Sequence, residues 1–108
     1  MNWTNLTELA QIEEIVTQSS QQPILIFKHS TSCSISSMAK SRVERQWNFD
    51  AEAIKPYYLD LIANRAVSNA VAEHFGIQHQ SPQVLLIKDG ACVYNASHTA
   101  ISVGAIPI

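Results

Sequence analysis

A short apolar run that leads through a polar turn into a helix constrains the fold of this chain most. Residues Ile24–Lys28 are β-branched or apolar on both faces, which is typical of a central strand covered on two sides. His29–Ser32 then form a polar turn, and apolar residues recur at helical spacing from Ser34 onward. This order predicts an α/β sheet with a site loop at the end of the buried strand.

Three further segments show helical spacing, and two of them carry signals for a helix end. Asn5, followed by Glu8 three positions later, predicts a capping box at the start of the segment Leu6–Val16. Gly76 stands where a helix often ends on a glycine. The segments are Leu6–Val16, Val67–Phe75 and Thr99–Ile106.

The remaining apolar segments predict three more strands. Tyr57–Ile62 alternates weakly, and Asp89-Gly90 separates the apolar runs Val84–Lys88 and Ala91–Asn95, which predicts a tight hairpin. Because a helix connects the first two strands, we expect them to be parallel with a right-handed crossover. The chain is therefore expected to form a mixed four-stranded sheet with helices on both faces, as a single domain over residues 1–108.

Charge, apolar run length and cysteine count exclude several classes of function. A net charge of −2 offers no electrostatic attraction to nucleic acid or to an anionic membrane, so neither is expected as a partner. The longest apolar runs are far too short for a membrane span, and no secretory leader is visible. We therefore expect a cytoplasmic protein with reduced thiols. Two cysteines cannot form a four-cysteine zinc site, and no metal is expected.

Cys33 lies directly between the predicted central strand and the following helix. Unpaired N–H groups and the positive end of the helix dipole meet at such a position, where they stabilise a thiolate. Thiolates are the nucleophiles of thiol–disulfide exchange. The alternative is a buried cysteine that packs as a small hydrophobe. The polar residues on both sides of Cys33 favour the reactive thiol.

The sequence Cys33-Ser34-Ile35-Ser36 has the spacing of a dithiol redox motif, with oxygen in place of the second sulfur. Serine forms no disulfide, so this motif can form only a mixed disulfide with a substrate or a small thiol. Ser36 is a candidate hydrogen-bond donor to the Cys33 thiolate, or else an ordinary polar residue of a first helical turn. Upstream, Lys28 and His29 would add positive potential if the loop turned them toward the sulfur.

Four stretches together resemble the monothiol bacilliredoxin family, and the similarity extends from about Leu6 to Ser102. The resemblance implies a thioredoxin-like fold in which Cys33 is the nucleophile and Ser36 is the serine of the monothiol motif. It also implies that Pro82 is a cis-proline facing the active cysteine, with Ser81 presenting backbone groups to the substrate. The stretches are Phe27–Ser36, Val67–Glu73, Gln80–Gly90 and Ala96–His98.

The family resemblance implies removal of bacillithiol from S-bacillithiolated client proteins through a mixed disulfide on Cys33. The expected partners are these clients, a small thiol and a dithiol protein that recycles the enzyme. Bacillithiol acts as co-substrate and no cofactor is bound. Lys28 is expected either to attract the carboxylates of the small thiol or to be simply solvated. The family usually has proline where this chain has Ser34, and its loss should loosen the loop.

Three alternative functions stay open at this point. A monothiol glutaredoxin would use glutathione, and an iron–sulfur carrier of that type would carry Cys-Gly-Phe-Ser, from which Ser34 and Ile35 depart. A degenerate thioredoxin-like binding module would have no reactive thiol. Cys92, in the predicted hairpin, is expected to pack rather than to resolve a disulfide with Cys33. His79 is close to Pro82 in the sequence and is a candidate for lining the site.

Overall fold

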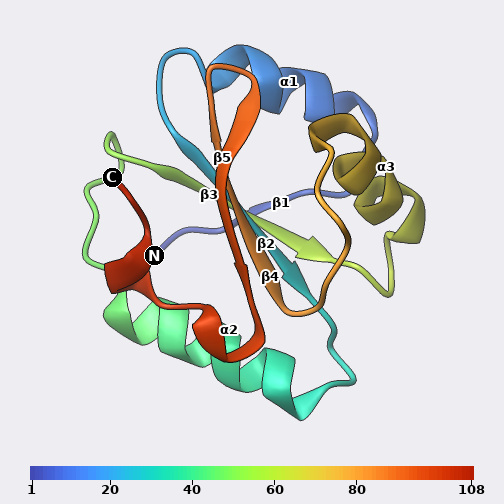
Figure 1. The fold of residues 1–108 in the computed structure, drawn as a ribbon, viewed down its shortest axis with the longest axis vertical. Helices are drawn as coiled ribbons and strands as arrows, with labels where there is room; N and C mark the ends of the chain where they lie inside the picture. The colour runs from blue at the N-terminus through green and yellow to red at the C-terminus, as the bar shows by residue number, and fades with distance from the viewer.

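Five strands form one mixed sheet, and three helices cover its two faces (Figure 1). The computed structural model describes residues 1–108. The strands are β1 (Thr4–Asn5), β2 (Ile24–His29), β3 (Lys55–Asp60), β4 (Gln83–Lys88) and β5 (Ala91–Ser97). The helices are α1 (Ala10–Gln18), α2 (Ser34–Gln46) and α3 (Arg65–Phe75), followed by the 3-10 turns η1 (His98–Ala100) and η2 (Val103–Ala105).

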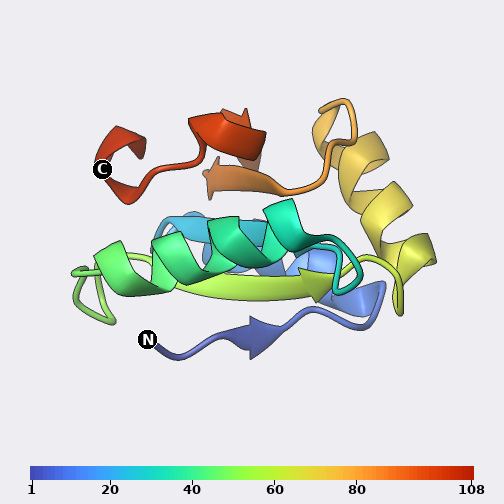
Figure 2. The ribbon, with the colours of Figure 1, turned by 90° about the horizontal axis from the view of Figure 1, so that it is seen from below.

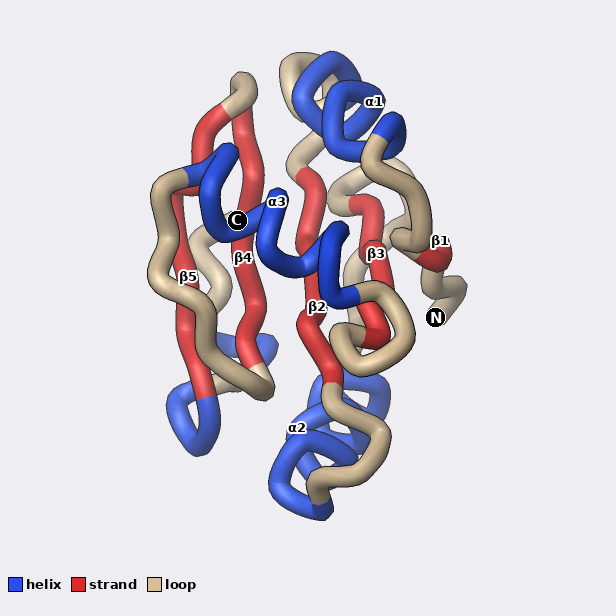
Figure 3. Tube along the Cα trace, turned by 90° about the vertical axis from the view of Figure 1, so that its right-hand side faces the viewer, coloured by secondary structure: helices blue, strands red, loops and turns tan.

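The strands lie side by side in the order β1-β3-β2-β4-β5 (Figure 3). The pair β2–β3 is parallel and the pair β4–β5 is antiparallel, so both predicted pairings are confirmed. The prediction of four strands was wrong by one, because β1 adds a short edge strand parallel to β3. The backbone N–H of Leu6 bonds the carbonyl of Tyr58 at 2.8 Å beside this strand. Two residues are too few for the sequence to show an alternation.

Strand β2 separates two apolar cores, because successive side chains point to opposite faces of a sheet. Ile24 and Ile26 belong to the core under α1 and α3, whereas Leu25 and Phe27 belong to the core under α2. Figure 2 shows α2 lying along its own face of the sheet, with both chain ends at one end of the molecule. The predicted arrangement of helices on both faces is therefore confirmed. None of the helices combines the length and apolar character that crossing a membrane requires.

One predicted helix start and one predicted helix were wrong. Helix α1 begins at Ala10, and Asn5 lies in β1 instead of capping it. In place of an Asn5 cap, the side chain of Gln11 binds the turn before α1. Its Oε1 accepts hydrogen bonds from the backbone N–H groups of Thr7 and Glu8, at 2.8 and 2.9 Å. The predicted last helix is replaced by η1 and η2, because Ile101, Val103 and Ile106 all pack into the α2 core and their spacing does not suit one helix.

Two turns follow their local sequence closely. Gly76 ends α3 in the left-handed conformation, at a φ of 66°. Asp89 and Gly90 connect β4 to β5 with φ values of 50° and 79°. Positive φ at both central residues matches the twist of a two-residue hairpin, for which Asp-Gly is a preferred pair. The predicted helix end and the predicted hairpin are both confirmed.

Candidate functional site

Cys33 is the residue that caps α2, as the sequence predicts. Its backbone is extended, with φ −112° and ψ 121°, and its carbonyl accepts the N–H of Ser37 at 3.1 Å. Its own N–H bonds the carbonyl of Ser30 at 3.1 Å, which closes the turn after β2. The thiol is free and partly exposed. The sulfur therefore belongs to the positive end of α2 and can be reached from outside.

Ser36 lies one helical turn further and faces the sheet, where it is completely buried. Its Oγ accepts the backbone N–H of Ser30 at 3.0 Å and lies 2.7 Å from Nδ1 of His29. Ser36 is therefore not an ordinary surface residue of the first turn. Its hydroxyl connects the loop after β2 to the start of α2, and its bond to the Cys33 thiolate stays a prediction.

His29 is the last residue of β2, and its ring lies among aromatic side chains on the α2 face. The ring centroid is 5.6 Å from that of Tyr58 and 6.2 Å from that of Phe27. Burial and the nearby Lys40 ammonium lower the pKa of His29, against a smaller opposing effect of Asp60. The imidazole is therefore neutral at neutral pH, and it adds no full positive charge to the site. His29 therefore does not supply the positive potential that its position in the sequence allowed, because burial disfavours the charged ring.

Sequence reasoning did not find the contact between His29 and Ser36, although the pattern held a signal for it. Alternation along β2 assigns His29 to the same face as Leu25 and Phe27, which is the face that α2 covers. Ser36 is the third residue of α2 and lies over that strand end. Pairing the two elements by face would have placed these side chains together.

Lys28 lies on the opposite face of β2, under α3, and is completely buried. Its Nζ donates to the carbonyl of Ser68 at 3.2 Å and lies 3.1 Å from Nδ1 of His79. Burial lowers the pKa of Lys28 to about 8. The alternative of a solvated lysine was wrong. Any attraction of a small thiol by this ammonium would act through space, so its substrate-binding role stays a prediction.

His79, an exposed residue of the loop before β4, lies at the outer edge of this polar cluster. Its Nδ1 lies 3.5 Å from Oγ of Ser68 in addition to its contact with Lys28. Burial and the neighbouring charges of Lys28 and Arg65 lower the pKa of His79. An ammonium only donates, so Nδ1 of His79 must accept, which fixes the ring in the form with its proton on Nε2.

The Ser81–Pro82 loop lies at the same end of the sheet as the Cys33 loop. The register pairs Lys28 with Gln83, so Pro82 is next to the end of β2 from which the Cys33 loop departs. The Ser81–Pro82 peptide is cis, in agreement with what the family resemblance implies. Ser81 Oγ is the one buried side-chain oxygen or nitrogen atom without a hydrogen-bond partner. The loop thus brings an unsatisfied hydroxyl to this end of the sheet.

Cys92 lies at the other end of the sheet. It pairs with Ile87, which in turn pairs with Ile24 at the start of β2, whereas Cys33 follows the end of β2. Five residues of strand span roughly 16 Å, well beyond the roughly 7 Å between Cα atoms that a disulfide allows. Its Sγ bonds the carbonyl of Tyr94 at 3.3 Å, and burial raises the pKa of the thiol. Cys92 packs against the α1 and α3 core.

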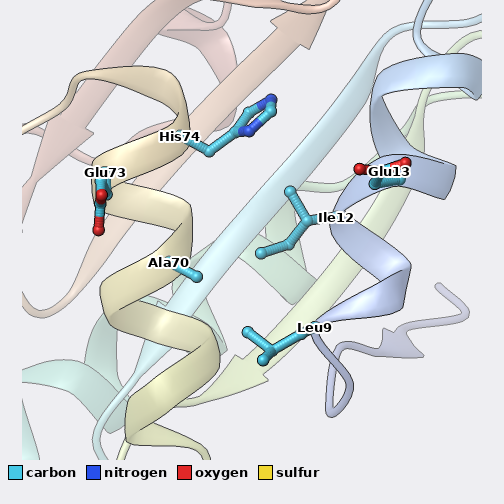
Figure 4. Close-up of a pocket in the computed structure, with 6 residues that line it drawn as sticks. All are labelled: Leu9, Ile12, Glu13, Ala70, Glu73 and His74. Carbon is cyan, nitrogen blue, oxygen red and sulfur yellow. The ribbon is translucent and has the colours of Figure 1, made fainter.

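Other parts of the surface offer no second centre of this kind. No three His, Cys, Asp or Glu side chains are grouped so that they could hold a metal ion. A groove of about 310 Å³ lies between α1 and α3, on the face of the sheet opposite α2 (Figure 4). Leu9, Ile12 and Ala70 point into it. The groove therefore lies away from Cys33, on the other face of the sheet.

The fold and the single thiol at the start of α2 define a thiol–disulfide oxidoreductase of the thioredoxin class. A family model described as monothiol bacilliredoxin BrxC matches residues 4–106. The chain belongs to this family of monothiol bacilliredoxins.

Solved structures agree with the thioredoxin fold. A protein described as an oxidoreductase with a thioredoxin fold superposes with a TM-score of 0.79 at 25% identity, over 94% of this chain and 87% of the other. Thioredoxin from Malassezia sympodialis matches with a TM-score of 0.70 at 15% identity, over 90% and 79%. Thioredoxin from Trypanosoma brucei brucei matches with a TM-score of 0.71 at 11% identity, over 90% and 79%. The last two similarities establish the fold alone.

Proposed function

We propose that this protein removes bacillithiol from S-bacillithiolated proteins. The observation that carries the proposal is the position of Cys33, a free and partly exposed thiol at the start of α2 with serine at the place of a second sulfur. Such a site exchanges one disulfide for another and cannot store an internal one within the motif. Membership of the monothiol bacilliredoxin family supports bacillithiol as the small thiol.

The reaction has two exchange steps. The Cys33 thiolate attacks the bacillithiol sulfur of the client's mixed disulfide, a new S–S bond forms between Cys33 and bacillithiol, and the bond to the client breaks. The client leaves as a thiolate and takes a proton from water. A second small thiol, as its thiolate, then attacks the bacillithiol sulfur, forms a low-molecular-weight disulfide and releases the Cys33 thiolate. A dithiol protein can perform the same second step and become oxidised itself.

The Ser81–Pro82 loop is the proposed binding surface for the substrate. It lies beside the end of β2 from which the Cys33 loop departs, and Ser81 Oγ has no partner in the free protein. An unpaired buried hydroxyl costs on the order of 1–3 kcal/mol. Because this oxygen is buried, the groups that Ser81 would offer to a bound substrate are those of its backbone.

The proposal needs no bound cofactor, and its partners are S-thiolated clients, the small thiol and a recycling dithiol. We assign the reaction to the cytoplasm, where thiols are kept reduced and mixed disulfides arise under oxidative stress. The ammonium of Lys28 would contribute through its field, since its side chain is enclosed.

The test is the release of bacillithiol from a model protein with one bacillithiolated cysteine. We expect wild type and Cys92→Ala to release it equally, and Cys33→Ala to release none. Mass spectrometry of the wild type should find bacillithiol attached to Cys33. Release by Cys33→Ala at the rate of wild type would contradict the mechanism.

A parallel incubation separates the two small thiols. The reduced protein is mixed with oxidised bacillithiol or with oxidised glutathione at equal concentration, and the adduct on Cys33 is measured over time. We expect faster modification by bacillithiol. A faster reaction with glutathione would assign the protein to glutathione chemistry instead, with the same exchange at Cys33.

A further inference from the structure

We propose that His29 is a positioning residue for Cys33, because the tautomer of its imidazole decides where the single hydroxyl hydrogen of Ser36 points. In one tautomer this hydrogen is held by His29, and in the other it is free for the sulfur of Cys33. The inference rests on the proposed function only in taking the Cys33 thiolate as the nucleophile. It assigns a role to a histidine that the exchange mechanism itself does not use.

Counting hydrogens at the Ser36 hydroxyl leads to this role. The backbone N–H of Ser30 already donates to Oγ at 3.0 Å, so this bond uses one acceptor position and no hydroxyl hydrogen. Nδ1 of His29 lies 2.7 Å away, which is a hydrogen bond in either direction. A serine hydroxyl has one hydrogen and two lone pairs. The imidazole therefore decides whether that hydrogen is used at this contact.

The two tautomers of His29 leave the hydrogen of the Ser36 hydroxyl with two different partners. With the imidazole proton on Nε2, Nδ1 accepts, and the Ser36 hydrogen is spent on His29. With the proton on Nδ1, the imidazole donates to Oγ, and the Ser36 hydrogen is free to bond a third group. The contact of 2.7 Å and the bond from Ser30 are satisfied in both cases. At Ser36, the two cases differ only in whether the hydroxyl hydrogen points toward His29 or away from it.

Cys33 is the acceptor that this free hydrogen favours. Cys33 is the N-cap of α2 and Ser36 its third residue, two positions whose side chains approach each other where a chain enters a helix. Ser36 is fully buried, so its hydroxyl is shielded from bulk water. Hydrogen bonds to a charged acceptor are roughly twice as strong as bonds between neutral groups. A thiolate on Cys33 therefore draws the hydrogen, and an uncharged sulfur releases it.

The imidazole can follow this change without gaining charge. Its pKa is lowered by burial and by Lys40, so it is neutral at neutral pH. The ionisable groups around it are Lys40 and Glu44 on α2 and Tyr58 and Asp60 on β3. When the Cys33 thiolate becomes a mixed disulfide, the ring gives its Nδ1 proton to water and takes one on Nε2, so its charge does not change. The Ser36 hydrogen then turns to the lone pair on Nδ1.

The direct test is nitrogen NMR of the imidazoles in the full-length protein, with Cys92→Ser to leave one thiol. The reduced protein, at several pH values from about 7 to about 10, is compared with protein methylthiolated on Cys33. We expect His29 to carry its proton on Nδ1 beside the thiolate and on Nε2 beside the disulfide. An unchanged His29 tautomer in the methylthiolated protein would overturn the inference.

The substitution test uses a cycle of variants and the rate at which iodoacetamide alkylates Cys33 at neutral pH. Loss of one bond to a charged sulfur in Ser36→Ala should slow alkylation about tenfold. His29→Phe should change the rate in the wild-type background and have no further effect in Ser36→Ala. His74→Phe, on the far face of the sheet, is the matched control and should leave the rate unchanged. Additive effects of the His29 and Ser36 changes would overturn the coupling.

The two tests also separate this inference from the proposed function, because neither uses bacillithiol. A Cys33 that forms no adduct with the methylthiolating reagent would contradict both. A Cys33 that reacts and releases bacillithiol from clients, beside a His29 that keeps one tautomer, would overturn the inference alone.

Discussion

Lys28 and His29 are neighbours in the sequence, yet their side chains lie on opposite faces of the sheet. Lys28 bonds the carbonyl of Ser68 under α3, and His29 contacts Ser36 under α2. The ammonium is thus enclosed on the face away from Cys33, and the imidazole on the near face is neutral. Neither residue places a positive charge at the Cys33 loop. The positive potential there comes from the N-terminus of α2.

The first prediction concerns the pH dependence of stability caused by Lys28. Its pKa in the folded protein is about 8, below its ordinary value of 10.5. Between these values the unfolded chain binds more protons than the folded protein, so the free energy of unfolding rises with pH. Below the folded pKa the full cost of burying the ammonium applies. In Lys28→Met this dependence disappears.

We therefore expect wild type to gain stability relative to Lys28→Met as the pH rises from about 8 to about 10, by at most about 1.4 kcal/mol for each unit of pKa lowering. Urea unfolding at several pH values measures the difference. Groups that titrate in both proteins cancel in it. A difference that stays constant over this range would show that the buried lysine keeps its ordinary pKa.

The second prediction concerns the structural contribution of Ser36. Ser36→Ala leaves the partly buried backbone N–H of Ser30 and the buried Nδ1 of His29 without their partner. Each unsatisfied group costs on the order of 1–3 kcal/mol, and water entering the site recovers part of it. We expect a loss of about 2 kcal/mol by urea unfolding. The matched control is Ser37→Ala, which alters an exposed neighbour on the same helix and should change stability little.

The third prediction restores the residue that the family usually has at the start of the helix. Ser34 is the first residue of α2, a position where the N–H needs no helical partner and the φ angle suits proline. Ser34→Pro should stabilise the protein by about 0.4–1 kcal/mol, because it restricts the unfolded chain. Thermal unfolding measures this gain. Ser41→Pro, inside the same helix, should be strongly destabilising, and a lower melting temperature for Ser34→Pro would refute the loosened loop.

The fourth prediction compares two glycines. Gly90 has a φ of 79° in the hairpin, so Gly90→Ala should destabilise the protein by about 1–2 kcal/mol. Gly104 has no positive φ, and a Cβ there would meet its nearest neighbour, Oγ of Ser102, at 3.9 Å. Gly104→Ala should therefore be almost neutral. Equal melting temperatures for the two variants would contradict the assigned turn.

The fifth prediction concerns the order in which the two thiols react. Burial raises the pKa of Cys92, and its Sγ is bonded to the carbonyl of Tyr94, whereas Cys33 lies at a helix start. The cysteines are exposed briefly to iodoacetamide at neutral pH and then identified by peptide mapping. We expect Cys33 to be alkylated several-fold faster than Cys92. Faster modification of Cys92 would require a different nucleophile from the one proposed.

Local patterns were sufficient for much of the site. The apolar run of β2, the polar turn and the helical period after it correctly predict Cys33 at the start of α2. The Asp89-Gly90 hairpin followed from the backbone preferences of two residues. The family resemblance added the cis peptide before Pro82, for which the local sequence indicated only a turn.

The sequence by itself determined four of the five strands, where α2 begins and which sulfur stands at its start, because these depend on periodicity and on the preferences of adjacent residues. Only the tertiary structure decided that Lys28 is enclosed, that His29 meets Ser36, and that Cys92 lies at the far end of the sheet. Those outcomes depend on the face and register with which distant segments pack. Side-chain environment, and hence charge, is set by such packing and not by neighbours along the chain.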